Sequence, residues 1–276
     1  MSVYKHSNAI LLAVFALMAC EQQPAGEPVV RAEIGEAVPR AAAETVPVAE
    51  NAETFGACTS VTFENIPLTH CVADPAVHQI STGLAPASGD NFGTIEGWAA
   101  GRNESAIAFV MNGGMYDDAL KPVGYFVRDE DRLAELNRED GSGNFYLKPN
   151  GVFFGTGDNW LILDSETFVR TVGTRPEFGT QSGPMLVVNG ELHPDIQDNG
   201  PSKAIRNGVG IDADGKAHFV ISDGTLSFGQ LARYFRDELK TPNALFLDGN
   251  VSSLWDPATG RMDSRRVGPL IVVETK

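Results

Sequence analysis

The sequence predicts an α+β domain built on a mixed or antiparallel β-sheet with a few helices. Short runs of β-branched and aromatic residues recur along the chain, and glycine, asparagine or aspartate bounds each run. Only two segments space their apolar residues as a helix does. The predicted strands are residues 106–111, 123–127, 152–154, 160–163, 184–188, 217–221, 244–247 and 269–273.

The two predicted helices cover residues 92–100 and 228–239. Asp90 or Asn91 would cap the first helix, and Ser227 directly precedes the second. In the second segment, apolar residues recur at helical spacing, which gives one stripe for the core.

Turn residues separate the strands. Residues 212–215, Asp-Ala-Asp-Gly, lie between two extended runs and predict a β-hairpin. Residues 129–144 are rich in charge and glycine and interrupt the strand pattern. This segment is either a solvated surface excursion or a lid over neighbouring strand ends.

The N-terminal residues indicate export. Lys5 precedes an apolar run over residues 9–19, which is too short for a permanent membrane span. A small residue directly precedes Cys20, as in a bacterial lipobox, so residues 1–19 are predicted to be a lipoprotein signal peptide and Cys20 the lipidated residue. The alternative is an ordinary signal peptide with an incidental cysteine.

We expect an exported bacterial lipoprotein, held at the outer membrane and facing the periplasm, with the lipid anchor as its only membrane contact. Glu21 differs from the aspartate that is associated with inner-membrane retention. Residues 20–55 are rich in Ala, Glu, Pro and Val and cannot bury enough apolar area to offset ordering entropy. They are predicted to form a flexible tether, and residues 56–276 suffice for one large domain.

Two further cysteines, Cys58 and Cys71, are predicted to form a disulfide, because cysteines in exported proteins usually pair. Residues 59–66 and 68–72 resemble two arms of a hairpin with Pro67 at the bend. A zinc site is a poorer interpretation, since no second Cys or His pair stands at ligand spacing.

The formal net charge of −15 at pH 7 argues against a nucleic-acid partner, whose phosphates would be repelled. A local arginine can still bind a small anion. No nucleotide-cofactor motif is found, and the sequence requires no cofactor. A divalent cation such as Ca²⁺ is an option beside the acids and amides at the strand ends, although no EF-hand-like spacing supports it.

Small and polar residues cluster at the ends of several predicted strands. Asp248 ends the run at 244–247, and more hydrogen-bonding residues follow it than a turn requires. This excess predicts a binding site, with a turn that binds no ligand as the alternative. The clustered residues are Asn112, Gly113, Gly114, Asn150, Gln181, Ser182, Gly183, Arg206, Asp248, Gly249, Asn250, Ser252 and Ser253.

Two of these side chains suggest chemistry by themselves. Arg206 offers a planar fork for phosphate or carboxylate in an acidic chain; an ion pair with an acid is the alternative. Ser182 lacks the Gly-X-Ser-X-Gly context, and no histidine is identified as its partner, which argues against a serine hydrolase.

Five ordered motifs together resemble the phosphodiester glycosidase family, in its bacterial branch. The motifs are NGGMY followed by PVGYFV, KPNGVFF, QSGPMLV, RNGVGI and NALFLDGNVSSL, and the resemblance covers about residues 106–273. Asn250 stands where the family usually has a second glycine after Leu-Asp-Gly, a change expected to alter the loop.

The resemblance implies hydrolysis of a sugar-1-phosphodiester on envelope or environmental glycans, releasing the sugar and a phosphomonoester. Asp248 would act as base, nucleophile or stabiliser of an oxocarbenium ion, Arg206 would hold the phosphate, and Asn112 would hydrogen-bond the substrate. The expected substrate-binding residues are Gly113, Gly114 and Gly183, through their N–H groups, and Asn150, Gln181, Ser182, Gly249, Asn250, Ser252 and Ser253. A non-catalytic envelope lipoprotein that binds sugar phosphates is the alternative.

The sequence does not encode the separation between carboxylates, so it does not distinguish retaining from inverting hydrolysis. Candidate partners for Asp248 are Asp117, Asp118 and Asp223. Lys148 is either a second positive charge in the site or, more simply, a surface lysine.

Overall fold

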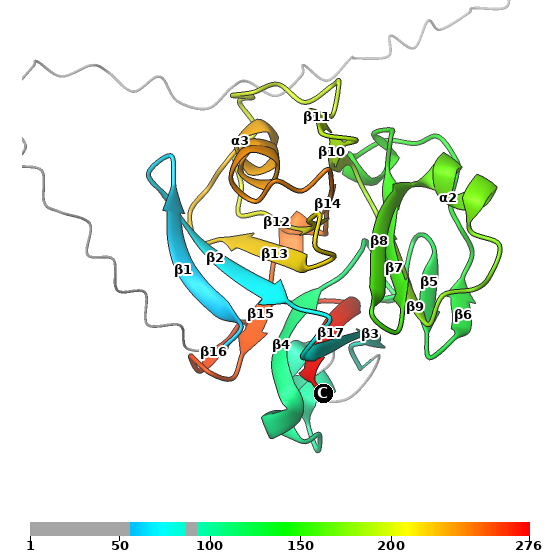
Figure 1. Cartoon of the computed structure of the whole chain (residues 1–276), viewed down its shortest axis with the longest axis vertical. Helices are drawn as coiled ribbons and strands as arrows, with labels where there is room; N and C mark the ends of the chain where they lie inside the picture. The colour runs from blue at the N-terminus through cyan, green and yellow to red at the C-terminus, as the bar shows by residue number, and fades with distance from the viewer. Residues whose placement is uncertain (1–55, 87–92) are drawn as a thin grey trace, which may run out of the picture. The chain divides into compact units, whose positions relative to one another are not determined.

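The computed structural model describes residues 56–86 and 93–276. The predicted signal peptide, the lipidated Cys20, the tether and the candidate caps Asp90 and Asn91 lie outside the described residues. The described part contains three β-sheets (Figure 1). All strand pairs in these sheets are antiparallel, as in an antiparallel α+β fold.

Each sheet combines strands that are distant in sequence. The first has the order β1 (Cys58–Phe63), β2 (Ile66–Ala73), β13 (Ala217–Ser222), β12 (Asn207–Ile211), β14 (Asn243–Phe246), β10 (Met185–Val188) and β11 (Glu191–Leu192). The second has the order β16 (Arg261–Met262), β15 (Leu254–Asp256), β4 (Ile107–Asn112), β17 (Pro269–Thr275) and β3 (His78–Leu84). The third has the order β6 (Asp131–Ala134), β5 (Phe126–Arg128), β9 (Phe178–Ser182), β7 (Gly151–Thr156) and β8 (Asn159–Asp164).

The helices are short. They are α1 (Ile95–Ala99), α2 (Ser165–Thr171) and α3 (Phe228–Arg233), which continues as a π-helical turn over Tyr234–Glu238, with 3₁₀ turns at Glu104–Ala106, Asn144–Tyr146 and Gly249–Val251. No helix in residues 56–86 or 93–276 is both long and apolar enough to cross a membrane.

The caps explain where these helices begin. Ser227 forms a capping box with Gln230, which confirms the predicted start of α3. The predicted start of α1 at residue 92 was too early, because the side chain of Thr94 accepts from the Gly97 N–H and caps the helix. Helix α2 was not predicted; Asp164 caps it through the Thr167 N–H.

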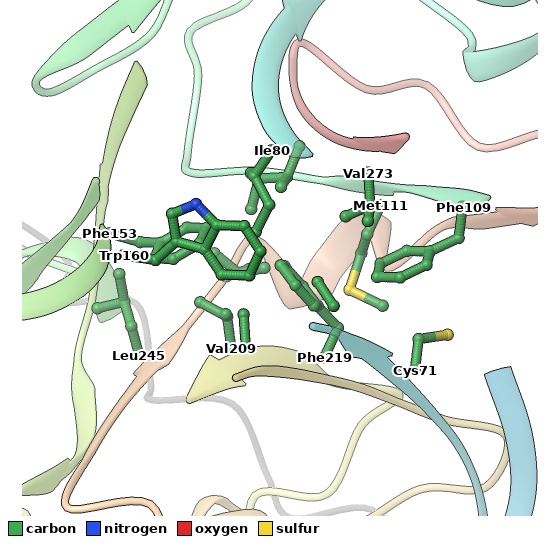
Figure 2. Close-up of a cluster of buried hydrophobic side chains, with 14 of the residues drawn as sticks. Cys71, Ile80, Phe109, Met111, Phe153, Trp160, Val209, Phe219, Leu245 and Val273 are labelled. Carbon is green, nitrogen blue, oxygen red and sulfur yellow. The ribbon is translucent and has the colours of Figure 1, made fainter. Parts of the chain in front are cut away.

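A hydrophobic cluster joins strands from all three sheets (Figure 2). The ring centroids of Phe109 in β4 and Phe219 in β13 lie 5.2 Å apart, and Phe153 in β7 lies 5.9 Å from the same Phe219 ring. Trp160 and Leu245 add buried area from β8 and β14. This shared core holds together strand ends that belong to different sheets.

Cys58 and Cys71 face each other in the β1–β2 hairpin and form the predicted disulfide. The predicted bend at Pro67 was wrong. Glu64 and Asn65 make the turn with positive φ angles of 48° and 63°, while Pro67 lies inside β2.

Two other predictions differ from the structure. Gln181 and Ser182 end β9 and do not open the next strand, which begins at Met185. Residues 129–144 include the edge strand β6, so the segment is partly strand. The predicted hairpin is confirmed, since residues 212–215 join β12 to β13.

Candidate active site

The polar ends of β4, β12 and β14 meet. Asp248, two residues after β14, donates its N–H to the carbonyl of Gly113, which directly follows β4, at 3.2 Å. Leu247 donates to the carbonyl of Asn207, the first residue of β12, at 3.1 Å. These backbone bonds bring three distant segments of the sequence to one place.

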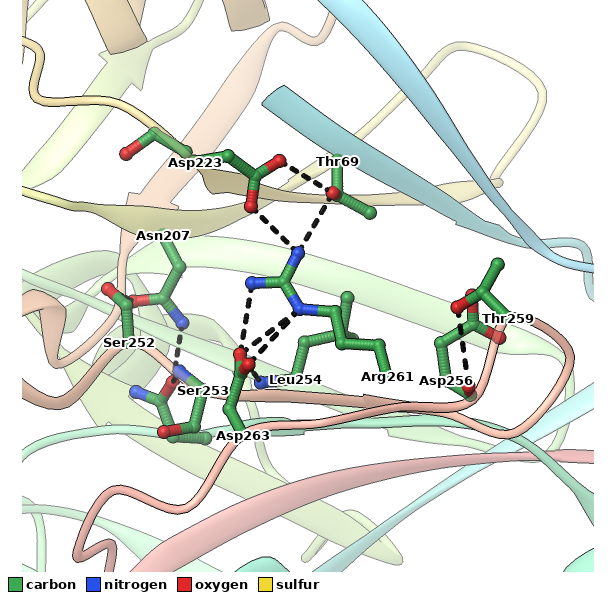
Figure 3. A network of polar contacts seen from close by, with 12 residues as sticks. Thr69, Asn207, Asp223, Ser252, Ser253, Leu254, Asp256, Thr259, Arg261 and Asp263 are labelled. Carbon is green, nitrogen blue, oxygen red and sulfur yellow. Dashed lines mark hydrogen bonds and ion pairs between the residues drawn. The ribbon is translucent and has the colours of Figure 1, made fainter. Parts of the chain in front are cut away.

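Asn112 links these segments through its side chain. Its Nδ2 donates to the Asp248 carbonyl at 2.9 Å, while its Oδ1 accepts from Asn207 Nδ2 and from the Ser253 N–H, each at 2.9 Å. Ser252 Oγ donates to Asn207 Oδ1 at 3.1 Å (Figure 3). We call these five residues the Asn112 network.

The Asn112 amide is 1% exposed and its strong hydrogen bonds all run to the protein. A saturated, buried amide has no donor or acceptor left for a sugar. Asn112 therefore positions the Asp248 turn in this structure, and the expected direct contact of Asn112 with substrate does not match its geometry. Ser253 is likewise satisfied, because its Oγ donates to the Val251 carbonyl at 2.7 Å.

The Asp248 carboxylate is half-buried. Burial raises its pKa, and the Asn250 N–H offsets part of that rise. Tyr116 lies close enough for the Asp248 charge to act on it: burial and then this charge raise the pKa of Tyr116 to about 12. The Tyr116 hydroxyl donates to the Arg266 carbonyl at 2.6 Å. Asp248 is thus a carboxylate of increased basicity beside a neutral phenol.

Arg206 is buried, with 4% of its surface exposed. Its guanidinium lies 3.6 Å over the ring of Phe228, and it donates to the Leu226 carbonyl and to Ser202, each at 3.1 Å. Arg206 forms no ion pair within the described residues, so the alternative interpretation from the sequence, an ion pair with an acid, is not observed there. Burial lowers the pKa of Arg206 to about 10. A buried cation without a counter-ion favours the binding of an anion.

The backbones of Arg206 and the Asp248 turn lie close together in space, but the charged groups of the two side chains do not contact each other. A Cβ built on Gly249 would stand 3.6 Å from the Arg206 Cα, so the two backbones lie close together, and it would overlap the Phe246 ring, for which the glycine makes room. No hydrogen bond or ion pair joins the guanidinium to the Asp248 carboxylate in the part of the chain that is described. The structure therefore brings the two segments together while the guanidinium extends towards Phe228.

The glycines of the site allow close packing. The Gly113 N–H donates to the Pro269 carbonyl at 2.7 Å, and the Gly114 N–H donates to Thr180 Oγ1 at 3.0 Å. Both N–H groups have protein partners in this structure, and their expected use as an anion cradle stays a prediction. A Cβ on Gly183 would meet the Phe145 carbonyl at 2.7 Å, which indicates a packing role as well.

Gln181 and Asn150 belong to a second polar cluster. Gln181 Oε1 accepts from the N–H groups of Tyr125 and Asn137, each at 2.9 Å, and its Nε2 donates to the Asn137 carbonyl at 2.7 Å. Asn150 Oδ1 accepts from Ser165 Oγ at 2.7 Å. Gln181 thus holds Asn137, within residues 129–144, against the third sheet, and Asn150 holds Phe145 and Ser165, so the structure gives both amides a scaffolding role.

The remaining candidates are dispersed. Ser182 is fully buried, and its hydroxyl has no hydrogen-bond partner among the described residues. Asn250 is exposed at the tip of the Asp248 turn. Lys148 forms a surface ion pair with Asp140 at 2.6 Å, as the simpler interpretation predicted.

The proposed partner carboxylates do not pair with Asp248. Asp223 binds Arg261 and Thr69, each at 2.8 Å, and Asp117 accepts from two N–H groups of its own turn. Asp118 is exposed.

Sequence reasoning missed Asn207 and Tyr116. Both lie inside motifs that were recognised: Asn207 follows Arg206 in RNGVGI, and Tyr116 ends NGGMY. Attention to every polar residue of those motifs would have identified them. In residues 56–86 and 93–276, no group of three or more His, Cys, Asp or Glu residues is arranged to hold a metal ion.

Comparison with known proteins agrees with the motifs. The family model for phosphodiester glycosidases matches residues 105–274. The chain belongs to the phosphodiester glycosidase family.

Two relatives are informative. The chain is 34% identical over 183 residues to the uncharacterized protein YigE of Escherichia coli strain K12, a match that covers 66% of this chain and 71% of that protein. Among solved structures, it resembles the catalytic domain of zebrafish N-acetylglucosamine-1-phosphodiester alpha-N-acetylglucosaminidase, auto-inhibited by its pro-peptide, with a TM-score of 0.53 and 16% identity. That match covers 79% of this chain and 82% of the zebrafish chain and shows a shared fold.

Proposed function

We propose that the protein hydrolyses a sugar-1-phosphodiester on envelope or environmental glycans. Family membership supports the reaction type. The single structural observation that carries the proposal is Asp248, a half-buried carboxylate of raised pKa, held at a strand end by the Asn112 network. A phosphomonoester is a stable leaving group, so the reaction depends on a base and on charge neutralisation more than on a general acid.

In this reaction, water adds to the anomeric carbon while the bond from that carbon to the phosphate oxygen breaks. Asp248 accepts the proton of the water, and the bonding electrons leave with the phosphomonoester. The half-buried carboxylate can instead stabilise the oxocarbenium ion or attack it directly. Arg206 supplies positive charge close to the turn, from a site with no carboxylate partner in the described residues.

We further propose that the protein acts as an exported lipoprotein, anchored at the outer membrane through Cys20 and facing the periplasm. The lipobox-like start and the composition of residues 20–55 support this location. A lipid anchor with a tether would keep the enzyme near envelope glycans. Fractionation with radiolabelled palmitate tests it: label retained by Cys20→Ser would contradict the anchor.

Turnover of aryl sugar-1-phosphodiesters by the purified protein tests the activity. We expect Asp248→Asn to lower turnover by about 100-fold or more and Arg206→Met, which retains much of the volume, to reduce it. Asp131→Asn is the matched control, because Asp131 is exposed and lies in the edge strand β6. No turnover with any sugar, or equal turnover by Asp248→Asn, would refute the proposal. Activity that survives EDTA would show that no divalent cation is needed.

A binding lipoprotein without catalysis is the second candidate. The observation that favours it is the Arg206 guanidinium, which stacks on Phe228 and is not joined to the Asp248 carboxylate. A catalytic site would bring both charges to one substrate. Thermal stabilisation by sugar phosphates, with no product released over hours, would favour this candidate.

A further inference from the structure

A polar hollow adjoins the turn that carries Asp248. Its volume is about 350 Å³, within the usual range of small-molecule sites. Ser252 lines it, and the Ser252 Oγ also lies 3.0 Å from the carbonyl oxygen of Gly249, the residue after Asp248. The hollow and the candidate catalytic turn thus share a wall.

Charged side chains that line the hollow are fixed by contacts with one another, and Figure 3 shows these contacts. Arg261 Nη1 donates to Asp223 at 2.8 Å, and Arg261 Nη2 contacts Asp263 at 3.0 Å. Asp263 also accepts from the Leu254 N–H at 2.9 Å, and Thr69 donates to Asp223 at 2.8 Å. These groups are held before any ligand arrives. Carboxylate oxygens with unused lone pairs and a guanidinium suit the hydroxyls of a sugar.

Arg265 lies at the rim and is exposed. Its only hydrogen bond in the described residues is a long one of 3.5 Å to the Asn250 carbonyl, and it has no ion pair there. The Asp248 carboxylate interacts with the N–H of that same Asn250. Standard backbone dimensions therefore place the carboxylate and the guanidinium within about 10 Å of each other.

The charges around the hollow indicate which part of a ligand each arginine would contact. Asp223 and Asp263 more than balance the charge of Arg261, so this cluster has no positive charge left for a phosphate and suits the uncharged hydroxyls of a sugar. Arg265 retains an unpaired positive charge, which suits phosphate. In a chain of net charge −15, an anionic ligand requires such a local cation.

We propose that the hollow binds the sugar of a sugar-1-phosphate group and that Arg265 holds its phosphate. This inference rests on the proposed function and deepens it, because it places the scissile bond beside Asp248 and adds a cation to Arg206.

Calorimetric titration of the full chain with N-acetylglucosamine 1-phosphate and glucose 1-phosphate tests the inference by binding alone. The wild-type protein is expected to bind at least one of them. Arg265→Gln should weaken that binding about tenfold or more, as expected for a charge-assisted contact, and Arg265→Lys should recover part of it. Ser264→Trp, which places an indole in the hollow, should abolish it. The control Arg170→Gln, on α2, should bind as the wild type does.

The outcomes are distinct from those of the turnover assay. No binding of either sugar 1-phosphate by the wild type, or unchanged binding by both Arg265→Gln and Ser264→Trp, overturns the inference whether or not turnover occurs. Binding that is lost in both variants supports it. If the wild type then shows no turnover, only the proposed catalysis fails.

Discussion

Asn112→Ala provides the sharpest test of how the site is built. The variant removes three buried hydrogen bonds, to the Asp248 carbonyl, Asn207 Nδ2 and the Ser253 N–H. At roughly 1 kcal/mol net for each bond, the free energy of unfolding should fall by about 3 kcal/mol. The buried partners left unsatisfied can only increase this loss.

Urea unfolding, monitored by tryptophan fluorescence, measures the effect. For a domain of this size, the loss corresponds to a decrease of about 6–12 °C in Tm. Asn250→Ala is the matched control on the same turn; Asn250 is exposed, so a change within about 0.5 kcal/mol is expected. An Asn112→Ala protein that unfolds at the wild-type midpoint would refute the positioning role. It would favour the earlier interpretation, in which Asn112 contacts the substrate directly.

Other predictions concern charge and the disulfide. Asp248→Asn should lower kcat/KM by about 100- to 10,000-fold without lowering the free energy of unfolding at pH 7, because the ionised form of a buried carboxylate with raised pKa is disfavoured in the folded state. The acid limb of the wild-type kcat/KM profile should lie above the ordinary aspartate pKa of 3.8; a limb below it would exclude Asp248 as the base. Replacing Cys58 and Cys71 by alanine should cost about 3 kcal/mol in urea unfolding, and an unchanged midpoint would contradict this. Burial and the neighbouring His218 lower the pKa of His70 from 6.5 to about 4, so His70 contributes stability above pH 6.5 that is lost towards pH 4; NMR titration of His70 near pH 6.5 would refute this.

The strand prediction succeeded where local chemistry is strong. The run after Asn243 and the Asp212 hairpin follow from β-propensity and turn residues, and the structure has β14 and the β12–β13 turn there. Prediction failed where tertiary packing decides the conformation. The charged sequence of residues 129–144 does not predict a strand. Strand β6 forms there because it pairs with the edge of β5.

The candidate site was predicted in part. Polarity after a buried strand identified Asp248, and the structure places its N–H against the Gly113 carbonyl. Its catalytic role stays a prediction. The roles of Asn112 and Gln181 were not predictable, because an amide in a sequence gives no sign of whether its partners are protein atoms or a ligand. That distinction depends on groups more than 40 residues away.

The sequence by itself determined the family, the α+β class with a mixed or antiparallel sheet, the disulfide pair and the strand-end acid. Each of these depends on residue identity or on neighbours a few positions away. Only the tertiary structure decided that Arg206 lies over Phe228 and that Arg265 stands at the rim of a hollow beside Asp248. Side-chain direction and pairing arise from packing between sheets, where contacts join residues that no local pattern relates.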